Sequence, residues 1–172
     1  MAYAIVHDTA AGKTGVFMIL ATVRVTGIED ALVLQKPVRA FFEFGWDALN
    51  AYIKRNPWDL AMAINNKTVR TQDQLHIHLG CVRDDIRTTL DHASLSSKWT
   101  KVTLHGRTFS AIEVDSLAYS PFEILKTYLA PKGEQLGDYS LAVVGRDHRK
   151  FFLLATKSAA EVVMDEGPTC HK

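Results

Sequence analysis

Two histidines separated by one residue, His76 and His78, stand in an otherwise apolar segment, and Gln74 precedes them by two positions. Successive side chains of a β-strand point to opposite faces of a sheet. If residues 74–82 form a strand, the three polar side chains therefore share one face. The other face would carry apolar side chains: Leu75, Ile77 and Leu79. Because polar groups are costly to bury without partners, this alternation predicts that the polar face lines a cleft.

A histidine pair with this spacing has several interpretations. The pair can be structural or lie on the surface without chemistry, or it can supply two ligands to zinc. Zinc needs further ligands, however, and the sequence has neither a carboxylate at a familiar spacing nor a His-Glu-x-x-His segment. A two-motif phosphoesterase needs two separate His-x-Thr/Ser strands, whereas Leu79 follows His78 and the lone His92-Ala93-Ser94 follows a predicted helix. We therefore expect no metal site here. The segment also resembles the His-x-His-x-His signature of histidine-triad nucleotide hydrolases, with Gln74 in the first position, His76 in the middle and His78 in the third.

The first half of the chain predicts a sheet with one long helix. Residues 4–7 and 15–25 are rich in Val, Ile, Phe and Thr around a Gly-containing turn, which is typical of a hairpin. Residues 37–53 place apolar and aromatic side chains at helical spacing, which predicts the longest helix, packed on the sheet. A short apolar strand follows at 60–64, and a polar loop leads to the histidine strand at 74–82.

The second half adds further strands and shorter helices. The predicted elements are a helix at 84–92, strands at 100–104 and 108–114, a helix at 121–129, and strands at 139–144 and 151–155. The tail, residues 158–172, has no clear period and is predicted to be loosely ordered. Many strands with short connections and few helices indicate an α+β fold. We expect a single domain over residues 1–172, with a mostly antiparallel sheet, a long helix packed on it and additional C-terminal strands.

Composition narrows the functional classes. The chain has 172 residues, 47% hydrophobic residues and a net charge of +1, so a general nucleic-acid partner is not expected. No segment approaches the roughly 20 apolar residues that span a bilayer, and the N-terminus lacks the pattern of a signal peptide. The two cysteines, Cys81 and Cys170, are too few for a disulfide scaffold. They can form one bond or remain two free thiols.

The segment around the histidines resembles one branch of the histidine-triad superfamily, the CDP-diacylglycerol pyrophosphatases. That branch carries a Gln-x-His-x-His variant of the triad, preceded by Arg-Thr/Ser-Gln and followed by a cysteine and an arginine. The corresponding run here is residues 70–83. The similarity extends to residues 22–29, to Phe44-Gly45-Trp46 and to the predicted strand at 151–155, and it covers most of the chain.

The resemblance implies a histidine-triad fold and hydrolysis of CDP-diacylglycerol to CMP and phosphatidate, without a cofactor. The middle histidine, His76, would be the nucleophile, and a nucleotidyl-histidine intermediate would form on it. His78 would contact the phosphate or the leaving oxygen. Gln74 can orient a group or donate a hydrogen bond, but it cannot act as an acid.

Residues near the motif are candidates for neutralising the substrate phosphates. They are Asn65, Arg70 and Thr71 in the loop before the motif strand, and Arg24 on a neighbouring predicted strand. Each of them can equally be a solvated polar residue.

Two other functions fit the same motif. A soluble histidine-triad enzyme would act on dinucleoside polyphosphates or nucleoside phosphoramidates, and a non-catalytic module would only bind a nucleotide or a lipid. The resemblance further implies attachment to the inner membrane on its periplasmic side, through a preceding segment that this chain lacks; a cytoplasmic protein is the alternative. The expected partners are a liponucleotide substrate, a membrane surface and, as in many superfamily members, a second copy of the chain.

Overall fold

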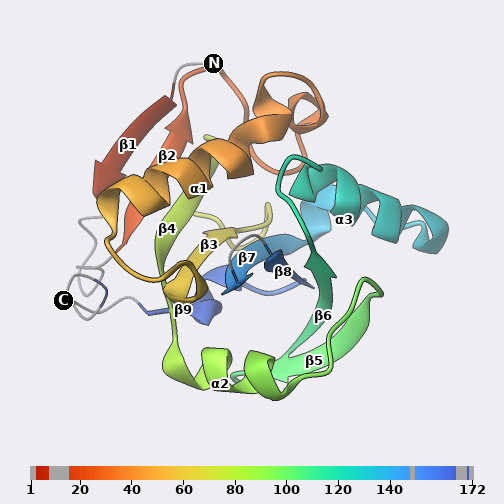
Figure 1. Cartoon of the computed structure of the whole chain (residues 1–172). Coiled ribbons are helices and arrows are strands. Elements are labelled where there is room, and N and C mark those ends of the chain that lie inside the picture. Colours follow the sequence, from red (N-terminus) through yellow and green to blue (C-terminus); the bar gives the residue numbers. More distant parts are fainter. Residues whose placement is uncertain (1–2, 8–15, 148–149, 166–169, 171–172) are drawn as a thin grey trace.

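A single sheet organises the molecule. The computed structural model describes residues 3–7, 16–147, 150–165 and 170. Its strands lie in the order β1-β2-β4-β3-β7-β8-β6-β5, and β9 pairs with β4 outside this path (Figure 1). Every strand pair in the described part of the chain is antiparallel. The histidine strand β4 therefore lies inside the sheet, with β2 on one side and β3 on the other.

The strands are β1 Tyr3–His7, β2 Phe17–Ala21, β3 Leu60–Ile64, β4 His76–Val82, β5 Thr100–Leu104, β6 Arg107–Val114, β7 Ser140–Asp147, β8 Lys150–Thr156 and β9 Met164–Asp165. The α-helices are α1 Phe41–Tyr52, α2 Asp84–His92 and α3 Pro121–Leu129. Short 3₁₀ helices occupy Ala31–Leu34, Val38–Ala40, Pro57–Asp59, Ala130–Lys132, Leu136–Asp138 and Ala160–Val163.

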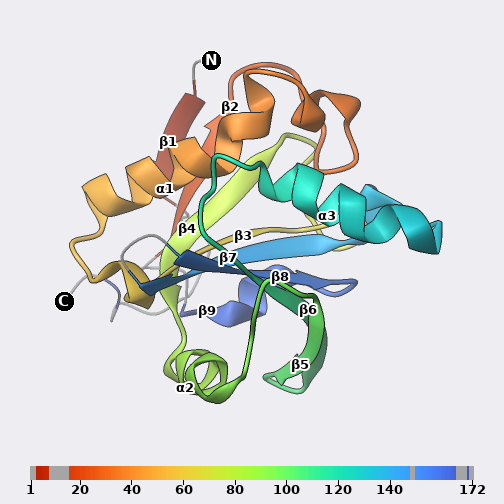
Figure 2. The ribbon, with the colours of Figure 1, turned by 45° about the vertical axis from the view of Figure 1, so that its right-hand side comes forward.

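Helices cover both faces of the sheet. Helices α1 and α3 lie on one face, whereas α2 and the segment leading into β9 lie on the other (Figure 2). The first face packs a cluster that includes Phe41, Phe42 and Phe122 together with the apolar side chains of β4. The second packs Ile86 and Leu90 of α2 against the other side of the sheet. Strand β4 contributes side chains to both buried clusters.

The predicted α+β class is confirmed: the sheet is antiparallel, the long helix packs on it, and β5 to β9 add strands in the second half of the chain. Strand β3 and helix α2 have the predicted bounds. The hairpin also forms, because β1 pairs with β2, while residues 8–15 lie outside the described residues. Within the described residues, no helix combines the length and the apolar character needed to cross a membrane.

Two predicted strand ends beside the motif were wrong, and β7 runs to Asp147 rather than to residue 144. Strand β2 ends at Ala21 rather than at residue 25, and β4 begins at His76 rather than at residue 74. The cause is a local bulge: the Ala21 N–H donates to the Leu75 carbonyl, and the Leu75 N–H donates to the Val25 carbonyl. Residues 22–24 are looped out between these two hydrogen bonds and are exposed.

The described part of the tail contains regular structure. Residues 160–163 form a 3₁₀ helix, and β9 pairs with β4 at Cys81 and Val82. Ala160, Val163 and Met164 are buried in the cluster beneath α2. Burial of these apolar side chains against the sheet stabilises this segment, although its sequence shows no local periodicity.

Candidate active site

His76 is held in one tautomer by the backbone beside it. Its Nδ1 lies 2.7 Å from the Gln74 carbonyl oxygen. A carbonyl oxygen only accepts, so Nδ1 carries the proton and Nε2 carries the lone pair. Within the described residues, Nε2 makes no hydrogen bond. His76 is 6% exposed, and the lone pair of its Nε2 is thus fixed in orientation at a largely buried site.

His78 contacts a carboxylate from the tail. Its Nε2 is 3.1 Å from Oε1 of Glu161, which lies in the 3₁₀ helix Ala160–Val163. The rings of His76 and His78 stand edge to face with centroids 5.0 Å apart. Both rings share the face of β4 opposite Leu75, Ile77 and Leu79, as the alternation predicted.

Asn65 contacts the tail beside the histidines. It directly follows β3, and the β3–β4 register, in which Ala63 faces His78, brings it level with His76 when continued by two residues. The Asn65 amide donates to Glu161 Oε1, and its Oδ1 accepts from the Ala160 N–H at 3.1 Å. Asn65 and His78 thus contact the same carboxylate oxygen of Glu161. Asn65, His76 and His78 of the predicted site thus lie close together. Glu161 lies with them, although sequence reasoning missed it.

Gln74 supports the motif rather than sharing the histidine strand. Its side-chain Nε2 donates to the carbonyls of Ala21 and Val23, the latter at 3.0 Å. Both amide hydrogens are thus used in closing the bulge after β2, and its backbone carbonyl holds His76. Only the side-chain oxygen is left to contact a ligand. The predicted donation of a hydrogen bond by Gln74 would therefore require one of these two hydrogen bonds to break. Its catalytic role stays a prediction.

The predicted phosphate-binding residues are not all gathered at the histidines. Arg70 has a 9% exposed side chain and pairs with Glu29 at 2.6 Å and with Asp73 at 2.9 Å. The Glu29 carboxylate raises the pKa of Arg70 above its usual value, in keeping with a guanidinium that is already neutralised. Thr71 is exposed in the loop before β4. Arg24 lies in the looped-out segment after β2 and not on a strand, which corrects its predicted placement.

A groove of about 550 Å³ borders the cluster of Asn65, His78 and Glu161, and two arginines also line it. No pattern in the sequence indicated that these two arginines lie near each other. Asn65 and Glu161 line it near the histidines, and Arg83 and Arg107 line it further away. Arg83 donates to Asp85 at 2.9 Å, which lowers the pKa of that carboxyl, and Arg107 donates to the Ala159 carbonyl at 3.2 Å. We call this space the arginine groove.

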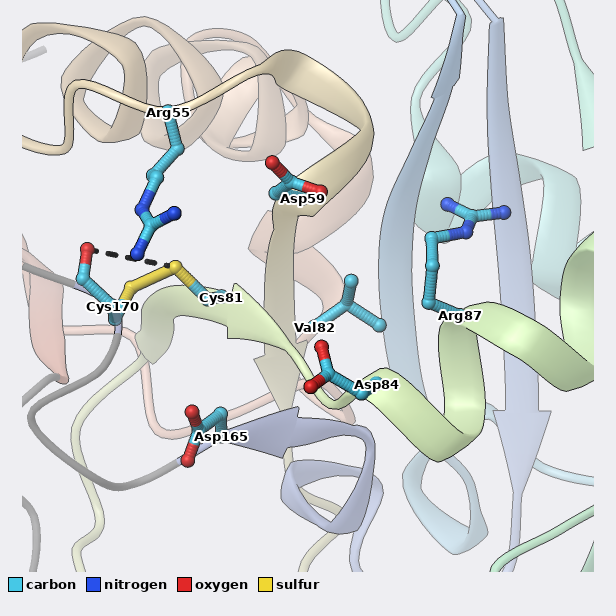
Figure 3. A pocket seen from close by; sticks show the side chains of 8 residues that line it. All are labelled: Arg55, Asp59, Cys81, Val82, Asp84, Arg87, Asp165 and Cys170. Carbon is cyan, nitrogen blue, oxygen red and sulfur yellow. Dashed lines mark hydrogen bonds between the residues drawn. A yellow bond between two sulfur atoms is a disulfide. The ribbon is translucent and has the colours of Figure 1, made fainter. Parts of the chain in front are cut away.

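A disulfide fastens the tail to the histidine strand. Cys81 and Cys170 are bonded, which decides between the two alternatives that the sequence left open. Figure 3 shows the bond in a second pocket, of about 440 Å³, which Arg55 and Asp165 also line. Because Cys81 lies three residues after His78 on β4, the bond places Cys170 close to the site.

Comparison with known proteins shows the family of this chain. A sequence model of the CDP-diacylglycerol pyrophosphatase family matches residues 1–168. The chain belongs to that family. Its activity is therefore the hydrolysis of the pyrophosphate of CDP-diacylglycerol, and the family match covers the histidine strand, Asn65 and Glu161 alike.

A solved structure shares the fold of this CDP-diacylglycerol pyrophosphatase. It is the crystal structure of a DUF4931 family protein from Bacillus cereus ATCC 10987. The two chains are 9% identical, and the likeness covers 99% of this chain and 90% of the other, with a TM-score of 0.51. At this identity the likeness concerns the fold alone. The antiparallel sheet with its covering helices thus occurs in a protein of very different sequence.

Glu161 is a residue of the candidate site that sequence reasoning missed. It lies in a tail without periodicity, and it is distant in sequence from both of its partners. A single acidic residue in such a tail gives no local signal, because only tertiary packing brings it to His78. Within the described residues, no three His, Cys, Asp or Glu side chains form a cluster suited to a metal ion.

The ion pairs of Arg70 give a first testable prediction, which concerns the stability of the fold. Arg70→Gln is expected to lower the free energy of unfolding by about 2 kcal/mol, because it removes charge-assisted hydrogen bonds to Glu29 and Asp73. The matched control is Arg39→Gln, because the Arg39 side chain is 39% exposed and its Nη1 lies 3.7 Å from Oε1 of Glu123. That exposed pair should contribute at most about 0.5 kcal/mol. Urea denaturation of both variants measures the difference, and equal losses would show that the Arg70 cluster is not a stabilising contact.

Proposed function

We propose that this pyrophosphatase cleaves CDP-diacylglycerol to CMP and phosphatidate through a cytidylyl intermediate on Nε2 of His76, as in histidine-triad hydrolases. The observation that carries the proposal is the 2.7 Å contact between His76 Nδ1 and the Gln74 carbonyl. It places the proton on the nitrogen that faces the backbone and leaves the other nitrogen as a nucleophile. A carbonyl in that position also stabilises the positive charge that the ring acquires during attack.

In the first step, the Nε2 lone pair attacks the cytidylyl phosphorus and an N–P bond forms. The bond from that phosphorus to the bridging oxygen breaks, and its electron pair leaves with phosphatidate. In the second step, water attacks the same phosphorus, the N–P bond breaks, and its electrons return to Nε2. The water proton is released to solvent or to phosphatidate, and CMP departs. Dividing the hydrolysis in this way replaces one high barrier by two lower ones.

The leaving group needs little protonation by a general acid. A phosphate monoester has a second pKa of about 6, so phosphatidate departs near neutral pH without full protonation. This agrees with Gln74, which has no proton to give. We assign to His78, held by Glu161, the contact with the phosphate oxygens, because its ring lies beside that of His76 on the same face.

A trapping experiment tests the intermediate. Enzyme turning over CDP-dioleoylglycerol labelled with ³²P in the cytidylyl phosphate is quenched in alkaline denaturant. Label is expected on the protein, stable to base and labile to acid, because phosphoramidate bonds to histidine hydrolyse in acid. Peptide mapping should place it on His76. Label on another residue, or full activity without any label, would exclude the mechanism.

Turnover in H₂¹⁸O tests which phosphorus is attacked. Attack on the cytidylyl phosphorus predicts that ¹⁸O enters CMP and not phosphatidate, as mass spectrometry of the products would show. Entry into phosphatidate would mean attack on the lipid phosphorus. In the same assay, much faster turnover of diadenosine tetraphosphate than of the liponucleotide would favour the soluble nucleotide hydrolase.

We further propose that the enzyme acts at the periplasmic surface of the inner membrane and as a homodimer, as the family resemblance implies. Fractionation of cells that express the protein from its natural gene tests the location. Sedimentation velocity of the purified protein tests the assembly, and a monomer at micromolar concentration would contradict the second proposal.

A further inference from the structure

An apolar strip leads from the two histidines to the edge of the sheet. Met18 is paired with His78 and Leu20 with His76 in the β2–β4 register. On the edge strand, Val6 is paired with Met18, and Ala4 with Leu20. Side chains of directly paired residues lie on the same face, with Cβ atoms about 5 Å apart. The apolar strip consists of Ala4, Val6, Met18 and Leu20.

The strip is accessible on the histidine face. Val6 is 38% exposed, Ala4 is exposed, and Met18 and Leu20 are only partly buried. Ile19, which points to the opposite face, is completely buried in the cluster that includes residues of α1. Helix α1 therefore covers the other side of β2, and β1 ends the sheet beyond it. Exposed apolar rows of this kind beside a reactive site are typical of a binding surface.

The two sides of the histidine pair differ in polarity. In the sheet, β4 separates the apolar strip on β1 and β2 from Asn65, which follows β3 and lines the arginine groove. CDP-diacylglycerol has the same asymmetry about its scissile anhydride, with a charged nucleotide on one side and two acyl chains on the other. A phosphorus at His76 would thus have polar surface on one side and apolar surface on the other.

We propose that the apolar strip is the subsite for the acyl chains of the liponucleotide, with the nucleotide directed toward the arginine groove. The inference rests on the proposed function, because it takes His76 as the position of the reacting phosphorus. Packing acyl methylenes on Met18 and Leu20 removes apolar surface from water on both partners, which favours the lipid substrate over a water-soluble analogue.

The double variant Met18→Ser/Leu20→Ser tests the subsite. We expect kcat/KM for CDP-dioleoylglycerol in detergent micelles to fall at least about tenfold, since two apolar contacts are lost. The kcat/KM for CDP-glycerol, which has no acyl chains, should stay within about twofold. Tyr119→Ser is the matched control, because it removes a side chain that is 76% exposed before α3 and should leave both substrates unaffected.

Every other outcome contradicts the subsite. Equal losses for the two substrates would mean that the strip supports the fold or the chemistry, and no loss would mean that the chains bind elsewhere. A smaller sedimentation coefficient of the variant would assign the strip to contact with a second copy. If the double variant does not fold, Val6→Ser at the exposed edge repeats the comparison, with an expected loss of about threefold for the lipid substrate. Label trapping with CDP-glycerol tests His76 separately, so either proposal can fail alone.

Discussion

Replacing His76 with glutamine is expected to lower kcat for CDP-diacylglycerol at least about a thousandfold, the scale of loss seen when a covalent nucleophile is removed. Glutamine keeps a hydrogen-bonding side chain of similar length beside the Gln74 carbonyl, but its amide nitrogen has no available lone pair. KM should change little, because the ring contributes chemistry more than binding. Steady-state kinetics measure both constants, and the labelled protein adduct should disappear with the activity.

The chain offers a closely matched control for this substitution. His92 in α2 also places Nδ1 2.7 Å from a backbone carbonyl, that of Thr88, but it is exposed on the helix. His92→Gln should therefore leave kcat within about twofold of the parent enzyme. If His76→Gln retained the parent kcat, His76 would not be the nucleophile, and water would have to attack the anhydride directly.

The second large effect is expected at Glu161. Glu161→Ala should lower kcat about a hundredfold, because His78 loses the acceptor that orients its ring and the Asn65 amide N–H loses its acceptor. Glu161→Gln should recover activity to within about tenfold of the parent, since its amide oxygen can accept from Nε2 of His78. The effect should fall on kcat rather than on KM, because Glu161 acts through His78 and not through the substrate.

A purely structural role of Glu161 makes a different prediction. The matched control is Glu134→Gln, which removes the carboxylate that binds Lys157 at 2.8 Å in the chain just before the same 3₁₀ helix. It should change thermal stability slightly and kcat hardly at all. If Glu161→Ala lost activity only in proportion to its folded fraction, or if Glu161→Gln were as inactive as Glu161→Ala, orientation of His78 by an accepting oxygen would be disproved.

Local periodicity predicted the elements that carry the histidines. Alternation along β4 placed His76 and His78 opposite Leu75 and Ile77, because a strand imposes a two-residue period on any sequence with one buried face. Helical spacing likewise predicted α1, whose apolar stripe had to pack on the sheet. These features depend on neighbours in sequence, and they could therefore be predicted without knowledge of the rest of the chain.

Other local predictions failed where a tertiary contact intervened. The observed ends of β2 and β4 differ from the predicted ones because Leu75 makes its backbone hydrogen bonds across a bulge. No pattern in the sequence indicates this bulge. Arg70 stays a predicted phosphate ligand, but the fold pairs its guanidinium with Glu29, which the sequence did not indicate. Whether a charged side chain is available to a ligand depends on which opposite charges the fold places beside it.

The histidine pair illustrates the division between sequence and structure. The sequence by itself determined that two imidazoles share one face of a strand, because that follows from spacing alone. Only the tertiary structure decided that a backbone carbonyl selects the tautomer of His76, and that Glu161 reaches His78. Asn65 and Glu161 are 96 residues apart, and only burial of the tail against the sheet brings them together. Contacts of that separation depend on packing of the whole chain, which no local pattern contains.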